Sequence, residues 1–134
     1  MKFTVFGSSG YLGSSLVQKF KSEKIECLTP DIKKDKIEDK DLGHVIYAIG
    51  VSNFKQNPSK AIDAHVILLN KLLNEVKFQS FLYLSSTRIY YDAVSTDENS
   101  SFVINPSDNN NLYNISKIIN FCIQRQKVVI RILF

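Results

Sequence analysis

The sequence predicts an α/β protein in which a parallel β-sheet is flanked by helices. Short apolar runs typical of buried strands alternate along the chain with segments of helical periodicity, and this order is typical of a parallel sheet. A glycine-rich turn joins the first strand to the first helix. With 134 residues, 44% of them hydrophobic and 22% charged, the chain is expected to form a single domain over residues 1–134.

The first expected strand covers residues 2–6, where the sequence KFTVF is short and rich in residues that favour β-structure. The turn GSSGYLG follows it directly. The next segment, SSLVQKFKSE, places Leu16, Val17 and Phe20 on one side of a helix. The chain therefore begins with the order strand, turn, helix.

Three further strands and the most regular helix occupy the middle of the chain. Residues 24–30 are typical of a second strand, which Pro30 closes because proline cannot donate to a ladder. After a charged segment, residues 44–50 form a nearly continuous apolar run suited to a strand covered on both faces. A helix is expected over residues 58–77, and the next buried strand over residues 78–86.

The last third of the chain is expected to contain a long loop, a helix and a strand. Residues 87–110 are rich in Ser, Asn and Asp, and loops of this length in compact domains are often functional. Helical periodicity resumes over residues 111–126, and residues 127–134 are typical of a final strand.

The glycines of GSSGYLG predict a binding site for a dinucleotide. Gly7, Gly10 and Gly13 have the spacing GxxGxxG between the first strand and the first helix. The first permits a tight turn, the second lets the backbone approach a phosphate, and the third allows close packing of helix against strand. The N-terminus of that helix offers unpaired amides and a partial positive charge to a pyrophosphate.

Asp31 is a candidate ligand of the adenosine ribose. It follows Gly13 by 18 residues, at the end of the second expected strand, where dinucleotide-binding folds use a carboxylate for the ribose hydroxyls. This favours NAD over NADP, because a carboxylate repels a 2'-phosphate. The alternative is that Asp31 only belongs to the charged turn PDIKKDK, whose Lys33 and Lys34 would accommodate the phosphate of NADP.

Composition argues against several other classes of protein. The apolar runs are much shorter than the roughly 20 residues of a membrane span, and the N-terminus lacks a signal peptide, so a cytoplasmic location is expected. The net charge of +4 comes from dispersed lysines with acids between them, which does not favour nucleic-acid binding. Cys27 and Cys122 have no metal-binding spacing and are expected to be buried free thiols.

The segment YNISK places Tyr113 and Lys117 about one helical turn apart on the same side of a helix. The spacing is compatible with a solvated helix face or with a catalytic pair. A phenol with a pKa near 10 is a poor base at pH 7, and a nearby ammonium group favours its ionised form.

A set of motifs resembles the N-terminal half of the extended short-chain dehydrogenase/reductase family, the NAD-dependent nucleotide-sugar epimerases and dehydratases. The motifs are, in order, the glycine turn, HVIYAIG, DAHVILLNKLL, FLYLSSTRIYY, YNISK and VVIRILF. The resemblance covers nearly the whole chain. It implies a Rossmann-like fold, the cofactor NAD and a nucleotide-sugar substrate.

The resemblance also assigns roles to individual residues. Tyr113 would be the general acid/base, Lys117 would lower the pKa of the tyrosine and hold the nicotinamide ribose, and Ser86 would bind the reacting oxygen, with Thr87 as the second choice. In the cofactor site, the resemblance adds the following residues: Tyr11 and Leu12 beside the pyrophosphate, and Ala48, Gly50 and Val51 beside the ribose groups.

The sequence departs from the family pattern in four places. Only 13 residues separate Asp31 from the strand near Val45, so the third strand and its helices are expected to be lacking. His65 stands where the family often has an asparagine, and Tyr91 replaces a glycine. The chain also ends 17 residues after Lys117, without the C-terminal substrate domain of the family.

These observations leave two functional hypotheses. The first is the nucleotide-binding domain of an NAD-dependent sugar-nucleotide epimerase/dehydratase-like protein, with activity of this chain alone in doubt. The alternative is a non-catalytic, degenerate Rossmann module that acts as a binding or regulatory partner. In that case a homo-oligomer is expected to form through the sheet edge or helix face that the missing segments leave uncovered.

Overall fold

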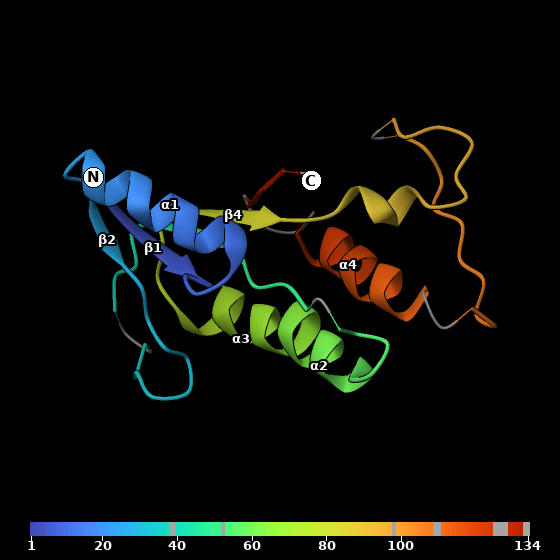
Figure 1. The fold of residues 1–134 in the computed structure, drawn as a ribbon, viewed down its shortest axis with the longest axis horizontal. Helices are drawn as coiled ribbons and strands as arrows, with labels where there is room; N and C mark the ends of the chain where they lie inside the picture. Colours follow the sequence, from blue (N-terminus) through green and yellow to red (C-terminus); the bar gives the residue numbers. More distant parts are fainter. Residues whose placement is uncertain (38–39, 52, 98, 109–110, 125–128, 133–134) are drawn as a thin grey trace.

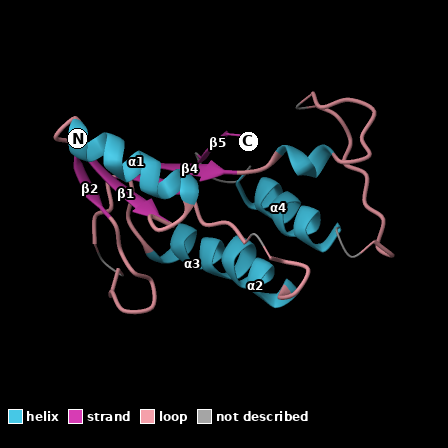
Figure 2. Ribbon diagram, in the orientation of Figure 1, coloured by secondary structure: helices cyan, strands magenta, loops and turns pink. Residues whose placement is uncertain are grey.

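A parallel β-sheet runs through the molecule, and helices pack on both of its faces (Figure 1). The computed structural model describes residues 1–37, 40–51, 53–97, 99–108, 111–124 and 129–132. Figure 2 shows the helices and strands, whose bounds are β1 (Lys2–Phe6), α1 (Tyr11–Ser22), β2 (Glu26–Leu28), β3 (His44–Tyr47), α2 (Pro58–Ile62), η1 (Asp63–Ile67), α3 (Leu68–Glu75), β4 (Ser80–Leu84), η2 (Thr87–Tyr90), α4 (Asn111–Gln124) and β5 (Val129–Ile132).

The strand order places a topological switch point beside β1. Within the described residues the sheet has five strands in the order β2-β1-β3-β4-β5, and all neighbouring strands are parallel. The chain leaves β1 for β2 on one side and then returns to β3 on the other side. In open α/β sheets, ligands bind in the crevice that forms at the carboxyl ends of the strands at such a point.

The Rossmann-like α/β fold is confirmed, and so is its shortened form. The chain passes from β2 to β3 through turns, and the described parts of residues 29–43 contain no helix or strand beyond one isolated bridge between Asp41 and Lys77. β3 pairs directly with β1, with Phe3 opposite His44 and Phe6 opposite Tyr47. Among the residues that the structure describes, no strand therefore lies on the outer side of β2, as the short spacing after Asp31 predicts.

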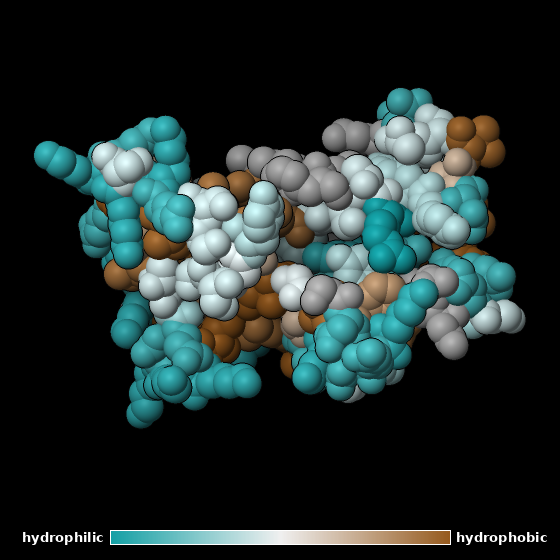
Figure 3. Space-filling model, in the orientation of Figure 1, coloured by the Kyte–Doolittle hydropathy of each residue, from teal (hydrophilic) through white to brown (hydrophobic). Residues whose placement is uncertain are grey.

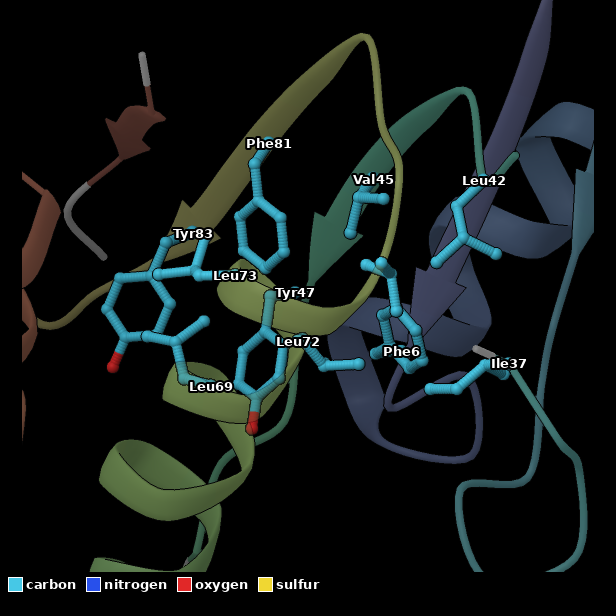
Figure 4. Packing of buried hydrophobic residues seen from close by; sticks show 11 residues of the cluster. Phe6, Ile37, Leu42, Val45, Tyr47, Leu69, Leu72, Leu73, Phe81 and Tyr83 are labelled. Carbon is cyan, nitrogen blue, oxygen red and sulfur yellow. The ribbon is translucent and has the colours of Figure 1, made fainter. Parts of the chain in front are cut away.

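Alternate residues of the strands supply the two hydrophobic clusters. Toward α3, large aromatic side chains of β1, β3 and β4 pack with leucines of the helix, as Figure 4 shows for Phe6, Tyr47, Phe81, Tyr83, Leu69, Leu72 and Leu73. Toward α1, Val5, Ile46 and Leu84 form a smaller cluster with partly buried side chains of the helix. This alternation follows from the two-residue period of a strand.

The helix expected over residues 58–77 is interrupted by one π-helical turn. α2 passes into the π-helix η1 and then into α3, which ends at Glu75. The amide of Leu68 donates to the carbonyl of Asp63, five residues back. The carbonyl of Ala64 instead accepts a hydrogen bond from the hydroxyl of Tyr47, a core residue of β3. The π turn therefore ties the helix to the sheet beneath it.

The strands are shorter than the sequence predicts because the chain turns into loops at the edge of the sheet. β2 ends at Leu28, β3 at Tyr47 and β4 at Leu84, each two or three residues before the expected end. Cys27 is a half-buried free thiol, whose pKa is raised by burial, and the side chain of Cys122 lies outside the described residues. Among the helices that the structure describes, none is long and apolar enough to cross a membrane.

Candidate functional site

The loops that follow β1, β3 and β4 meet at one edge of the sheet. Because all strands are parallel, their carboxyl ends point the same way, which places Gly7, Ala48 and Ser86 at this edge. The backbones of the first two loops touch: a Cβ atom added to Gly7 would lie 2.8 Å from the carbonyl carbon of Ala48. The amide of Ala48 also donates to the carbonyl of Phe6, at 2.9 Å.

The glycine turn brings the start of α1 against the end of β1. Gly7 has a φ of +84°, and its carbonyl accepts a hydrogen bond from the amide of Gly10 at 3.0 Å. A Cβ atom on Gly13 would lie only 2.1 Å from the same carbonyl oxygen. A side chain at position 13 would push the helix away from the turn, so the glycine spacing has a direct steric reason.

The N-terminus of α1 has the features of an anion-binding site. Gly10 is the N-cap residue, so no side chain accepts hydrogen bonds from the amides of the first turn, and this turn contains no acidic residue. These amides have no partner within a helix. The side chains of Tyr11 and Leu12 are exposed beside them. The helix is 12 residues long and presents its positive end to this edge of the sheet.

Asp31 lies three residues beyond the end of β2, and its carboxylate takes part in a local turn. One oxygen accepts a hydrogen bond from the amide of Lys33 at 3.0 Å, and the other lies 3.4 Å from Nζ of Lys34. The amide of Asp31 in turn donates to the carboxylate of Asp35 at 2.6 Å. The bond from the Lys33 amide is the main cause that holds the pKa of Asp31 below its ordinary value. This exposed turn carries two acids and two lysines close together, so its role toward a ribose or a 2'-phosphate stays a prediction.

Lys117 is buried in the protein without an acidic partner among the described residues. Its side chain is 3% exposed, and Nζ donates to the carbonyl of Leu84, the last residue of β4, at 3.4 Å. The ammonium also lies 4.8 Å from the centre of the Tyr83 ring. Burial lowers the pKa of Lys117 to about 8. The predicted lysine of the catalytic pair therefore points inward, to the end of β4, and does not belong to a solvated helix face.

Tyr113 lies one turn before Lys117 and is contacted by two rings and a guanidinium group from three other parts of the chain. Its ring centre lies 4.8 Å from that of Phe54, 5.3 Å from that of His65 and 5.3 Å from the guanidinium carbon of Arg88. Burial raises the pKa of Tyr113, whereas the charge of Arg88 and a hydrogen bond with the side chain of Ser86 act in the opposite direction. The structure thus brings Tyr113, Lys117 and Ser86 together at the carboxyl end of β4.

Ser86 is placed by the short helix η2. It is the N-cap residue of η2, and its hydroxyl accepts a hydrogen bond from the amide of Arg88 at 3.3 Å. The next residue, Thr87, is exposed. The hydrogen bond with Tyr113 makes Ser86 the candidate that stands beside the phenol.

His65 occupies the π turn beneath this site and is fully buried. Its Nδ1 lies 2.9 Å from the hydroxyl of Ser116, which donates its own hydrogen to the carbonyl of Tyr113 at 2.7 Å. Nδ1 of His65 is therefore the donor, and Nε2 carries a lone pair that has no hydrogen-bond partner among the described residues. Burial and then the charge of Lys117 lower the pKa of His65 to about 3. The histidine is neutral and joins η1 to α4 through Ser116.

Three residues of this cluster were not anticipated from the sequence: Phe54, Arg88 and Ser116. Ser116 lies inside the YNISK motif, next to Lys117, and Arg88 lies inside the FLYLSSTRIYY motif, two residues after Ser86, so both are neighbours of predicted site residues. Phe54 comes from the loop after β3, and no pattern links it to residue 113. A hollow of about 830 Å³ adjoins Phe54 and is lined on its other side by Pro106, Asp108 and Asn111.

No group of histidine, cysteine or acidic side chains suited to a metal ion occurs among the described residues. The chemistry of the cluster is that of a phenol, an ammonium, a hydroxyl and a guanidinium. These groups can move a proton and bind oxygen atoms.

Three solved structures share the fold of this chain, each with a TM-score of 0.63 and matched over 99% of this chain. They are a mutant UDP-glucuronic acid 4-epimerase from Bacillus cereus in complex with NAD and UDP-4-deoxy-4-fluoro-glucuronic acid (14% identity), the enzyme WbmG from Bordetella bronchiseptica in complex with NAD and UDP (13%), and dTDP-4-dehydrorhamnose reductase from Bacillus anthracis in complex with NADP (16%). The chain spans 56%, 52% and 53% of their lengths, respectively. Among curated proteins, none matches the sequence.

The comparison of the sequence with protein families confirms the resemblance to the NAD-dependent epimerases and dehydratases. The match extends over residues 3–125 and therefore includes the glycine turn, the end of β4 and the YNISK segment of α4. The chain belongs to the NAD dependent epimerase/dehydratase family.

Proposed function

We propose that the chain binds NAD or NADP across the carboxyl ends of β1 and β3, and that Tyr113, Lys117 and Ser86 carry the proton transfer of a hydride-transfer reaction on a nucleotide sugar. One observation carries the proposal. The uncapped N-terminus of α1 and the group formed by Tyr113, Lys117 and Ser86 lie at the same edge of the sheet, beside its switch point. The three solved neighbours support it, since their complexes hold NAD or NADP.

The residues of the glycine turn fit the diphosphate of such a cofactor. Gly10 leaves the amides of the first turn of α1 open to an anion, and Gly7 and Gly13 keep the turn close to the sheet. Ala48 and Gly50 would lie beside the ribose groups, because they belong to the loop after β3, whose backbone lies against Gly7. The nicotinamide, when bound, would supply or accept the hydride.

The side chains near Tyr113 would handle the proton. The phenolate form of Tyr113 would take the proton of the substrate hydroxyl as the adjoining carbon loses a hydride, and the resulting phenol would return the proton in the reverse step. The hydroxyl of Ser86 would donate to the same substrate oxygen. Burial keeps the phenol protonated, so the neighbouring cation and the serine are needed to stabilise the phenolate. Lys117, with a pKa of about 8, would carry its charge at neutral pH and would hold the hydroxyls of the nicotinamide ribose.

Calorimetric titration with NAD, NADH, NADP and NADPH tests the cofactor part of the proposal. Binding of at least one form below millimolar concentration is expected, and no heat for any of them at millimolar concentration would remove the cofactor claim. The variants Asp31→Asn and Lys33→Ala test the choice between the two dinucleotides. Loss of NAD affinity in the first supports a ribose ligand, and loss of NADP affinity in the second supports a phosphate site on the same turn.

Tyr113→Phe tests the chemical part. The variant keeps the ring that packs against Phe54 and His65 and removes only the hydroxyl. It is expected to bind the cofactor like the wild type and to lose turnover of nucleotide sugars by about 100-fold or more, in the range typical of a general acid/base. Unchanged turnover would exclude Tyr113 as the acid/base.

A second candidate function is a nucleotide-binding module without catalysis. The raised pKa of Tyr113 favours it, because a phenol that stays protonated is a poor base. In that case the wild type would bind the cofactor, but no nucleotide sugar would change its redox state. Self-association also stays a prediction, which light scattering of the purified chain would test.

A further inference from the structure

Arg88 is the cation beside Tyr113, and the proposed chemistry uses its charge but not its N–H donors. It is exposed on η2, two residues after Ser86, and its guanidinium carbon lies 5.1 Å from the ring centre of Phe54 and 5.3 Å from that of Tyr113. The two rings themselves are 4.8 Å apart. One planar cation therefore contacts both rings.

This arrangement holds the guanidinium in place but leaves its donors available. Aromatic faces stabilise a guanidinium by stacking and by cation–π attraction, and they do not use its N–H groups. Among the described residues, no carboxylate forms an ion pair with Arg88. Five N–H donors thus stand beside the phenol, in a geometry that suits a carboxylate or phosphate oxygen pair.

The charges around the phenol make Arg88 the cation that acts on it most. The charged or titratable side chains that face Tyr113 are Arg88 from η2, Lys117 from α4 and His65 from η1. His65 is neutral at ordinary pH, since its pKa is about 3. Nζ of Lys117 lies 5.9 Å from the centre of the Tyr113 ring and bonds to the end of β4 instead. The charge that lowers the pKa of Tyr113 against the effect of burial is that of Arg88.

We propose that Arg88 is a positioning residue for Tyr113 and, at the same time, the group that selects substrates with an anionic oxygen group close to the reacting carbon. The first part rests on the contact between the two side chains alone. The second part rests on the proposed function, since it requires a substrate at Tyr113. The anionic group would be a carboxylate or a phosphate on the sugar, bound by the N–H edge of the guanidinium.

The first experiment measures the titration of Tyr113 by NMR in protein labelled with 13C at the tyrosine ring carbon that bears the hydroxyl, with Tyr113→Phe to assign the signal. Arg88→Gln is expected to raise the pKa of Tyr113, and Arg88→Lys to restore part of the difference. Lys55→Gln, which removes an exposed cation next to Phe54, is the matched control and is expected to leave the pKa unchanged. An unchanged pKa in Arg88→Gln, with the chain folded by circular dichroism, would overturn the positioning role whether or not the protein is an enzyme.

The second experiment measures the affinity of the cofactor-loaded protein for UDP-glucuronic acid, for UDP-glucose, which lacks the carboxylate, and for UDP-glucose 6-phosphate. The wild type is expected to bind one of the two charged sugars about 10-fold or more tightly than UDP-glucose, and Arg88→Gln is expected to lose this preference while keeping the affinity for UDP-glucose. The charged sugar that shows the preference identifies the anion as carboxylate or phosphate.

The outcomes separate this inference from the proposed function. Equal affinity for all three sugars, or a preference that persists in Arg88→Gln, would overturn the selection by Arg88 while leaving the proposed function intact. Absence of cofactor binding in the wild type would count against the proposed function and against the selection, and the NMR titration would still decide the coupling of Arg88 to Tyr113.

Discussion

Lys117 and His65 are both buried, and burial acts on the pKa of each in the same direction. Each is held below its ordinary pKa, because the interior disfavours the charged form. The consequence for stability differs between them, since Lys117 is still charged at pH 7 whereas His65 is neutral. The charge state of each residue at pH 7 therefore decides how its substitution changes the stability of the protein.

Lys117→Met is expected to raise the free energy of unfolding at pH 7 by about 2 kcal/mol. The variant keeps a long apolar side chain and removes a charge whose burial lowers the pKa of the lysine from 10.5 to about 8. Between these values the unfolded chain binds more protons than the folded one, so the stability of the wild type rises with pH across this window and the advantage of the variant shrinks. Urea unfolding at pH 7 and at pH 10 measures both effects. A less stable variant at pH 7 would mean that the contacts of Lys117 with Leu84 and Tyr83 outweigh the cost of burial.

The same variant should lose cofactor affinity. If Lys117 is retained for function at the expense of stability, the variant should be more stable than the wild type and should bind NAD or NADP more weakly. Unchanged affinity would argue against contact between Lys117 and the nicotinamide ribose.

His65 is expected to make the protein sensitive to acid. Its pKa is about 3 in the folded chain and near 6.5 in the unfolded chain, so stability is fully present above pH 6.5 and falls as the pH decreases toward 3. At pH 4.5 the loss from this residue amounts to about 2–3 kcal/mol. His65→Asn should flatten the dependence of unfolding free energy on pH between 6.5 and 4.5. His44→Asn serves as the control, since His44 is half-buried on β3 and bonds to Ser80 at 2.9 Å. An equally steep profile in His65→Asn would assign the acid sensitivity to other groups.

At the scale of the elements, the junction of β1 and α1 depends on the absence of a side chain at position 13. Gly13→Ala would place Cβ 2.1 Å from the carbonyl oxygen of Gly7, and backbone on both sides of the contact would have to move. A loss of about 2–3 kcal/mol in unfolding free energy is expected, together with weaker cofactor binding. Gly50→Ala is the matched control, since nothing lies within 4 Å of its added Cβ, and its stability should change by no more than about 0.5 kcal/mol. Similar losses of unfolding free energy in both variants would show that the close approach of α1 to the turn does not require a glycine at position 13.

The elements also show which structural features could be predicted from the sequence and which could not. β1 has the expected bounds, because its apolar run is closed by the glycine turn. The π turn at Asp63–Ile67 was not predicted, since the helical period of the sequence gives no signal for it; within this turn, the carbonyl of Ala64 accepts a hydrogen bond from a tyrosine of β3. Likewise, nothing in the order of residues indicated that Phe54, Arg88 and Tyr113 would stack. Such contacts arise between loops whose conformation depends on the packing of the elements that they join.

For the whole molecule, the two faces of the sheet contribute unequally to stability. The face toward α3 contains the larger cluster of fully buried side chains, whereas the face toward α1 is open beside the helix, where a hollow of about 330 Å³ is lined by Leu12, Leu16, Ile46, Leu82 and Leu84. Hydrophobic surface is visible along α1 in Figure 3. A side chain on the α1 face therefore makes fewer contacts, and shortening it should cost less stability.

Leu72→Ala is accordingly expected to cost about 2–5 kcal/mol, as for other fully buried leucines. Leu16→Ala removes the same atoms from a partly buried site next to the hollow and should cost less than about 2 kcal/mol. Urea unfolding of both variants under one set of conditions measures the difference. Equal losses would indicate that the α1 face is covered in solution, for example by a second copy of the chain, and light scattering would then show the oligomer.

Local features of the chain are sufficient to predict the alternation of strands and helices, the missing third strand, the glycine turn and the candidate residues Tyr113, Lys117 and Ser86. These features are encoded locally, in hydrophobic period, in steric limits on glycine and in motif spacing. Three features became apparent only from the packing of the folded chain: Lys117 is buried against the end of β4, His65 is neutral and joined to α4 through Ser116, and Arg88 lies over the ring of Tyr113. The physical reason is that protonation and stacking depend on which groups distant in the chain exclude water from one another, and this is decided by packing across the sheet.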